Sequence, residues 1–156
     1  MAKRGKNLIP PLLRMGLGLF FLIVGTLKLR DLTAFTEDIF NYQILFPPYD
    51  GYAAYLIAWL EVVTGSIVIV GRWGTRGALL LIAAMLLSFI IALSTAANKG
   101  LNINCGCFGS SEEPTNFPLH ISLNATLLLL SAYLFWHQIH KRKKSLFGEK
   151  KLYLPS

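Results

Sequence analysis

Four long runs of apolar residues limit what this chain can fold into. They occupy residues 8–29, 52–70, 78–97 and 118–136, and few charged residues interrupt them. Each run is about 20 residues long, enough for a helix to cross the roughly 30 Å hydrocarbon core of a bilayer. Because lipid offers the backbone no hydrogen-bond partner, a spanning segment must satisfy its own N–H and C=O groups as a helix. The sequence therefore predicts an all-α integral membrane four-helix bundle, with residues 1–156 forming a single domain.

The distribution of charged residues predicts the orientation of this bundle. Most Lys and Arg residues precede the first run, separate the second run from the third, or lie in the tail at 137–156. Most Asp and Glu residues lie in the two other loops, at 30–51 and 98–117. Cytoplasmic loops of membrane proteins carry an excess of Lys and Arg. We therefore expect both termini to be cytoplasmic, and the two acidic loops to face outward from the cell (inner) membrane.

The net charge of +7 does not indicate a protein that binds nucleic acid. The sequence contains no basic patch interleaved with aromatic residues and no nucleic-acid-binding motif. The basic tail is better explained as a topology determinant that lies beside anionic lipids of the cytoplasmic leaflet. Membrane lipid is therefore its expected partner.

The first outward loop contains apolar residues at spacings of three and four, namely Leu32, Phe35, Ile39 and Tyr42. This spacing is typical of an amphipathic helix. We expect a short helix here that lies over the outer end of the bundle.

The second outward loop contains the only two cysteines of the chain, Cys105 and Cys107. They belong to the sequence Cys105-Gly106-Cys107-Phe108-Gly109. Two thiols so close together can alternate between dithiol and disulfide, and the outer side of the membrane is where disulfides persist. This placement favours a redox-active pair.

Two other interpretations of the cysteine pair stay open. A structural disulfide would close a very short loop, which removes little entropy from the unfolded chain. Metal capture is the second alternative, but two thiolates do not complete a tetrahedral zinc site and no ligand cluster lies nearby in the sequence. We expect thiol–disulfide exchange, and no metal.

Glu61 lies near the middle of the second apolar run, and Arg14 lies within the first. A carboxylate near the membrane midplane is costly and indicates a functional residue by default. The long side chain of Arg14 is expected to reach Glu61 if the two helix faces meet. The two residues would then form either a buried ion pair that fixes helix register, or a proton relay or contact for a quinone headgroup.

Lys28 and His120 lie at the outer ends of the first and fourth runs, on the side of the cysteines. A nearby cation lowers the pKa of a thiol and raises its thiolate fraction. Both residues are therefore candidates for a thiolate or headgroup contact. The alternatives are that Lys28 extends to the lipid headgroups and that His120 is an ordinary interfacial residue.

Over most of its length the chain resembles the DoxX/MauE superfamily of small four-helix bacterial membrane proteins. The residues that carry this resemblance are Arg14, Gly18, Phe21, Gly25, Lys28 and Leu29; Asn41-Tyr42-Gln43-Ile44-Leu45 ahead of a proline; Glu61, Gly65 and Gly71; and Cys105-Gly106-Cys107-Phe108-Gly109. The cysteine loop makes the chain similar to the MauE branch in particular. One departure is Leu123, which precedes Asn124 where MauE-like sequences commonly have an arginine.

The resemblance implies a role in redox maturation outside the cytoplasm. MauE-like proteins are associated with methylamine utilisation, where they are thought to help form disulfides of the dehydrogenase small subunit, usually with a thioredoxin-like partner. Other relatives in the superfamily are linked to quinone-coupled sulfur oxidation. The implied function is that of a thiol–disulfide oxidoreductase component with a thioredoxin-fold partner and a membrane quinone.

Two rival functions come from other classes of protein. A soft-metal uptake protein would use the cysteines to capture the ion, although the apolar runs offer only Met15 and Met85 as further sulfur ligands. A non-catalytic assembly protein would use the bundle to hold partners, and its cysteines would be dispensable.

Overall fold

The computed structural model describes residues 8–72, 74–101, 103 and 116–152, with side chains described as far as residue 140. Within these residues the chain forms five α-helices and no strand. In chain order the helices are α1 (Ile9–Arg30), α2 (Leu32–Asn41), α3 (Tyr49–Val70), α4 (Thr75–Asn98) and α5 (Phe117–Leu152).

Four of these helices are long and apolar enough to cross a membrane: α1, α3, α4 and the Phe117–His140 part of α5. Their mean hydropathies range from 1.5 to 2.6. The prediction of an all-α membrane bundle is therefore confirmed, and the spans differ from the predicted runs by only a few residues at most ends. α5 differs most, because it continues as one helix from the end of the span at His140 to Leu152.

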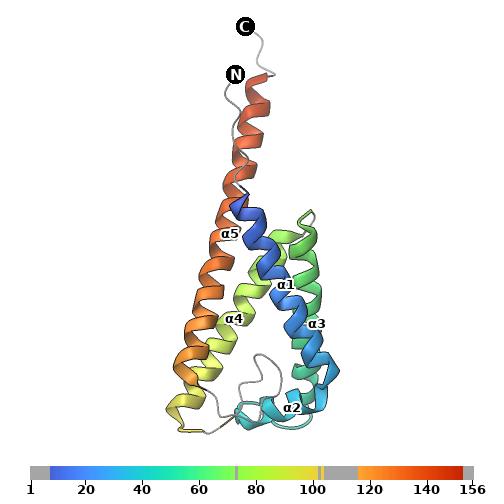
Figure 1. Cartoon of the computed structure of the whole chain (residues 1–156), viewed down its shortest axis with the longest axis vertical. Coiled ribbons are helices and arrows are strands. Elements are labelled where there is room, and N and C mark those ends of the chain that lie inside the picture. The colour runs from blue at the N-terminus through green and yellow to red at the C-terminus, as the bar shows by residue number, and fades with distance from the viewer. Residues whose placement is uncertain (1–7, 73, 102, 104–115, 153–156) are drawn as a thin grey trace.

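The four long helices form two closely packed pairs, α1 with α3 and α4 with α5 (Figure 1). The pairs meet mainly through α3 and α4, whereas α1 has few contacts with α5. α2 lies across the end of the bundle at which α1 and α4 end and α3 and α5 begin. We call this the α2 end. The opposite end, where α1 and α4 begin, is the terminal end.

α2 forms because its sequence supplies both a cap and an apolar face. The carboxylate of Asp31 accepts a hydrogen bond of 3.1 Å from the backbone N–H of Ala34, which caps the first turn. Phe35 is buried beneath the helix, and Tyr42, directly after it, is buried as well. The predicted short amphipathic helix over the end of the bundle is therefore confirmed.

Glycines bring the backbones of α1 and α3 into direct contact. A Cβ atom added to Gly65 would lie 2.7 Å from the carbonyl oxygen of Gly18 and 2.7 Å from the backbone nitrogen of Leu22. A Cβ atom at Gly25 would lie 2.8 Å from the Cβ of Glu61. Small residues permit such approach between helices in lipid, where van der Waals packing holds them together. These contacts fix the register of α1 against α3.

Gly65→Ala tests the importance of this contact. The added methyl group meets backbone atoms, which cannot rotate away, so we expect a loss of about 1–3 kcal/mol of unfolding free energy. Unfolding of the detergent-solubilised protein in increasing dodecyl sulfate measures it. Gly77→Ala is the matched control, because a Cβ there meets nothing within 4 Å. Equal stability of the two variants would contradict the argument.

Candidate functional site

A buried ion pair joins α1 to α3 inside the bundle. Nζ of Lys28, in the last turn of α1, lies 2.6 Å from Oε1 of Glu61, near the middle of α3. Both residues are only 2% exposed. Removing two charges from water is costly, and the cost is repaid only when geometry and hydrogen bonding are good. A short, direct contact between the two groups meets that condition.

The ammonium group of Lys28 also contacts two aromatic rings. Nζ lies 4.5 Å from the ring centroid of Phe35 on α2 and 4.7 Å from that of Phe89 on α4. The face of an aromatic ring carries negative potential, so both rings attract the cation. Residues from α1, α2, α3 and α4 therefore enclose this one charge. Lys28 points into the bundle, and the alternative that it extends to the lipid headgroups is wrong.

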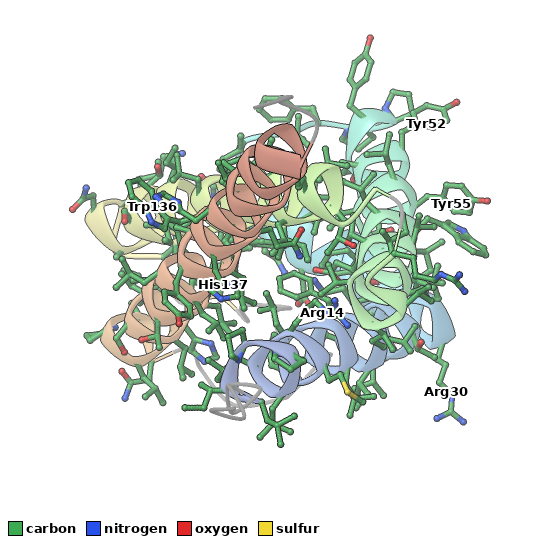
Figure 2. All side chains as sticks on the ribbon, turned by 90° about the horizontal axis from the view of Figure 1, so that it is seen from above. Arg14, Arg30, Tyr52, Tyr55, Trp136 and His137 are labelled. Atoms are coloured by element: carbon green, nitrogen blue, oxygen red, sulfur yellow. The ribbon has the colours of Figure 1, made fainter. Side chains whose placement is uncertain are left out.

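Arg14 does not pair with Glu61, so that prediction was wrong. Its Nη1 donates a hydrogen bond of 3.3 Å to the carbonyl oxygen of Gly71, the C-cap residue of α3. The contact lies at the terminal end, which Figure 2 views from above. The glycine contacts between α1 and α3 place Arg14 beside Gly71. Gly71 lies about 15 Å from Glu61 along α3, so Arg14 is too far away to pair with Glu61. Arg14 thus places a positive charge at a helix C-terminus, where the backbone dipole favours cations.

A small pocket adjoins the ion pair. It opens between α1, α3, α4 and α5, and the volume available to the centre of a water molecule is about 20 Å³. Its polar lining comes from Lys28, Glu61 and Asn124, and its apolar lining from Phe20, Phe21, Val24, Leu86, Phe89, Leu123 and Leu127. Nδ2 of Asn124 donates to the backbone carbonyl of His120 at 2.8 Å, which holds the amide at the pocket wall. The pocket is polar on one side and has room for about one water molecule.

His120 lies in the first turn of α5 and one turn from Asn124. The cysteine motif, from Cys105 through Gly106, Cys107 and Phe108 to Gly109, lies outside the described residues. The predicted contacts of Lys28 and His120 with a thiolate therefore stay predictions. The structure does bring Lys28 and Glu61 together, and this pairing was not predicted from the sequence.

Asp38 on α2 is a further charged residue near Lys28, and it was missed from the sequence. It is 5% exposed, and its burial raises the pKa of the carboxyl to about 6. The negative charge of Glu37 raises this pKa further, whereas the positive charge of Lys28 opposes the rise. Burial, reinforced by the charge of Asp38, also raises the pKa of the Tyr42 hydroxyl. The spacing of Phe35, Asp38 and Tyr42 on one helix face was the signal available for finding Asp38.

Fold and site together define a multi-pass helical membrane protein with a buried charge pair beside a polar pocket. The family model described as methylamine utilisation protein MauE matches residues 6–137 of this chain. The chain therefore belongs to the MauE family. No curated protein and no solved structure matched it.

A double-mutant cycle on the ion pair measures how strongly the two charges depend on each other. Lys28→Met or Glu61→Gln alone leaves one buried group uncompensated, which typically costs about 3–5 kcal/mol of stability. The double variant leaves no unpaired charge, so we expect it to be more stable than either single variant. Unfolding in dodecyl sulfate gives the four free energies.

Arg30→Met is the control for the loss of a cation from the same helix turn, because Arg30 is exposed and points away from the bundle (Figure 2). It should change stability little. Additive effects of Lys28→Met and Glu61→Gln in the double variant would contradict a direct interaction.

Asp38 predicts a pH dependence of stability. Its pKa is 3.8 in an unperturbed setting and about 6 in the folded protein, so the folded state binds the proton more tightly. The contribution of this group to stability therefore falls as pH rises from about 4 to about 6. Asp38→Asn removes that contribution, so its stability relative to the wild type should rise across this range. Thermal unfolding at several pH values measures it. Glu37→Gln should keep the fall in stability but shift it to slightly lower pH, because Glu37 raises the pKa of Asp38. A parallel pH course in Asp38→Asn and wild type would contradict the assignment.

Proposed function

We propose that the protein is a membrane thiol–disulfide redox protein whose cysteine pair exchanges disulfides with a thioredoxin-fold protein on the outer side of the membrane. The observation that carries this proposal is the Cys105-Gly106-Cys107 sequence between α4 and α5. Both helices meet that segment at the α2 end. The charge distribution supports an outward orientation for this end. Membership of the MauE family supports a role in methylamine utilisation.

The exchange proceeds by two thiolate attacks. The thiolate of one cysteine attacks the disulfide of the partner, breaks its S–S bond and forms a mixed disulfide. The second cysteine of the pair then attacks the mixed disulfide, which leaves a Cys105–Cys107 disulfide and a partner dithiol. Two electrons pass from the pair to the partner in this direction, and the reverse sequence oxidises the partner. The relative reduction potentials of the two proteins set the net direction.

The cysteine pair is better suited to thiol–disulfide exchange than to forming a structural disulfide. Closing so short a ring gives little stabilisation, and a disulfide that is strained and exposed is more readily reduced. Such a pair is suited to passing disulfides to exported proteins during their maturation. We propose maturation of exported proteins as the role of the exchange.

The pocket beside Glu61 does not fit a membrane quinone, the electron partner implied by the resemblance. A quinone ring is several times larger than a water molecule, and the pocket has room for about one water molecule. No electron-transfer step is therefore assigned to this pocket.

Redox titration of the cysteine thiols tests the proposed function. The purified full-length protein is equilibrated in glutathione buffers of graded potential, and free thiols are then labelled and counted by mass. We expect one two-electron transition, which disappears in both Cys105→Ser and Cys107→Ser. One of these variants should also form a mixed disulfide when its remaining thiolate attacks the disulfide of an oxidised thioredoxin-fold protein, because the variant has no second cysteine to resolve it.

Ser110→Ala, in the same loop, is the matched control and should titrate like the wild type. Cysteines that never pair, or that lose reactivity only after a soft metal ion is added, would overturn the proposal. The second of these results would favour metal capture.

A further inference from the structure

One oxygen of the buried carboxylate has no hydrogen-bond partner. Oε1 of Glu61 binds Lys28, but Oε2 is buried without a partner among the residues that the structure describes. A buried carboxylate oxygen without a hydrogen bond carries a large desolvation cost. Such an atom indicates that something else binds there.

The adjoining pocket can supply the missing partner. Its volume of about 20 Å³ is enough for one water molecule, which needs two to four polar neighbours. Glu61, Lys28 and Asn124 line the pocket. Nδ2 of Asn124 donates one of its two N–H groups to His120, which leaves the amide oxygen and the other N–H for further hydrogen bonds. A water molecule here can donate to Glu61 Oε2 and to the amide oxygen of Asn124 at once.

The charges around this pocket are unbalanced by one. Lys28 on α1 is the cation, while Glu61 on α3 and Asp38 on α2 are the carboxyl groups whose charges act on it. α4 contributes only Arg76 to the charged residues, and this residue lies at the terminal end. α5 contributes the imidazole of His120, one turn from Asn124. One bound proton therefore makes the group of Asp38, Lys28 and Glu61 neutral, as a low-dielectric interior favours.

We propose that Glu61 is a proton-binding site inside the bundle, completed by a water molecule in the pocket and favoured by the negative charge of Asp38. When hydronium delivers the proton, one O–H bond of that ion breaks as an O–H bond forms on Oε2 of Glu61. Lys28 keeps its ammonium group throughout.

The three charged groups extend from the α2 end into the bundle. Asp38 lies on the helix that covers the α2 end, Lys28 lies in the last turn of α1, and Glu61 lies deeper on α3. The site uses no cysteine, so it is independent of the proposed thiol exchange.

Infrared difference spectroscopy of the full-length protein in lipid nanodiscs tests the proposal. Spectra are recorded from about pH 6 to about pH 9, above the range in which exposed glutamates bind a proton, in H₂O and in D₂O. Glutamate labelled with ¹³C at the side-chain carboxyl separates the signal of Glu61 from those of Asp38 and Asp50. We expect the wild type to show the carbonyl stretch of a protonated glutamate that grows as the pH falls, shifts in D₂O, and disappears in Glu61→Gln.

Two further variants test the water molecule and the charge of Asp38. Asn124→Leu removes a hydrogen-bond partner of the water, so the carboxyl band should shift. Asp38→Asn removes a negative charge that acts on Lys28, so the group is neutral without an added proton and the carboxyl band of Glu61 should appear only at lower pH. Asp50→Asn is the matched control: Asp50 is 7% exposed, lies about 16 Å from Glu61 along α3, and should leave both properties unchanged.

The wild-type spectrum alone can overturn the proposal, even if a variant fails to fold. A glutamate signal that stays fully ionised across the pH range would show a static ion pair. A protonated band that persists in a folded Glu61→Gln protein would assign the proton to another glutamate. An unchanged pH dependence of the band in Asp38→Asn would exclude the proposed influence of Asp38 on this site.

Discussion

The arrangement of the helices depends on how the bundle accommodates a positive charge among apolar side chains. The ammonium of Lys28 needs the carboxylate of Glu61 and the faces of Phe35 and Phe89, which come from three other helices. Each of these groups is in place only if its helix is correctly rotated and seated. A charge with partners on several elements therefore favours one arrangement over the many that apolar packing alone would permit. Glycines at the α1–α3 contact provide the close approach that the ion pair requires.

The fold was predictable because its main determinants are local. Run length and hydropathy identify the spanning helices, and spacing identifies α2, without knowledge of tertiary contacts. The partners of the charges were not predictable in the same way. Arg14 and Lys28 lie on one helix face, and only the tertiary contact of Gly18 with Gly65 decides which of them reaches Glu61. The contact of Phe89 with Lys28 likewise depends on how α4 is seated in the bundle.

The two candidate sites differ in how they are supported. Evidence for the cysteine pair comes from its sequence, from the charge distribution and from membership of the MauE family. Evidence for the interior site comes from distances and burial, because Glu61, Lys28 and Asn124 lie far apart in the sequence yet line one pocket. Both sites are assigned to the same half of the bundle, since Asp38 and the helix ends that flank the cysteines lie at the α2 end.

The ion pair also has a consequence for how the chain enters the membrane. Lys28 and Glu61 are 33 residues apart, so the ribosome completes α1 before it makes the partner of Lys28. Lys28 lies close enough to the end of its helix to reach water before Glu61 has been synthesised. Glu61 lies near the middle of α3 and has no such route. The free-energy cost of moving α3 into lipid is therefore lowest when α1 is still beside it, because Lys28 can then pair with Glu61. The order of synthesis makes the cation before the anion.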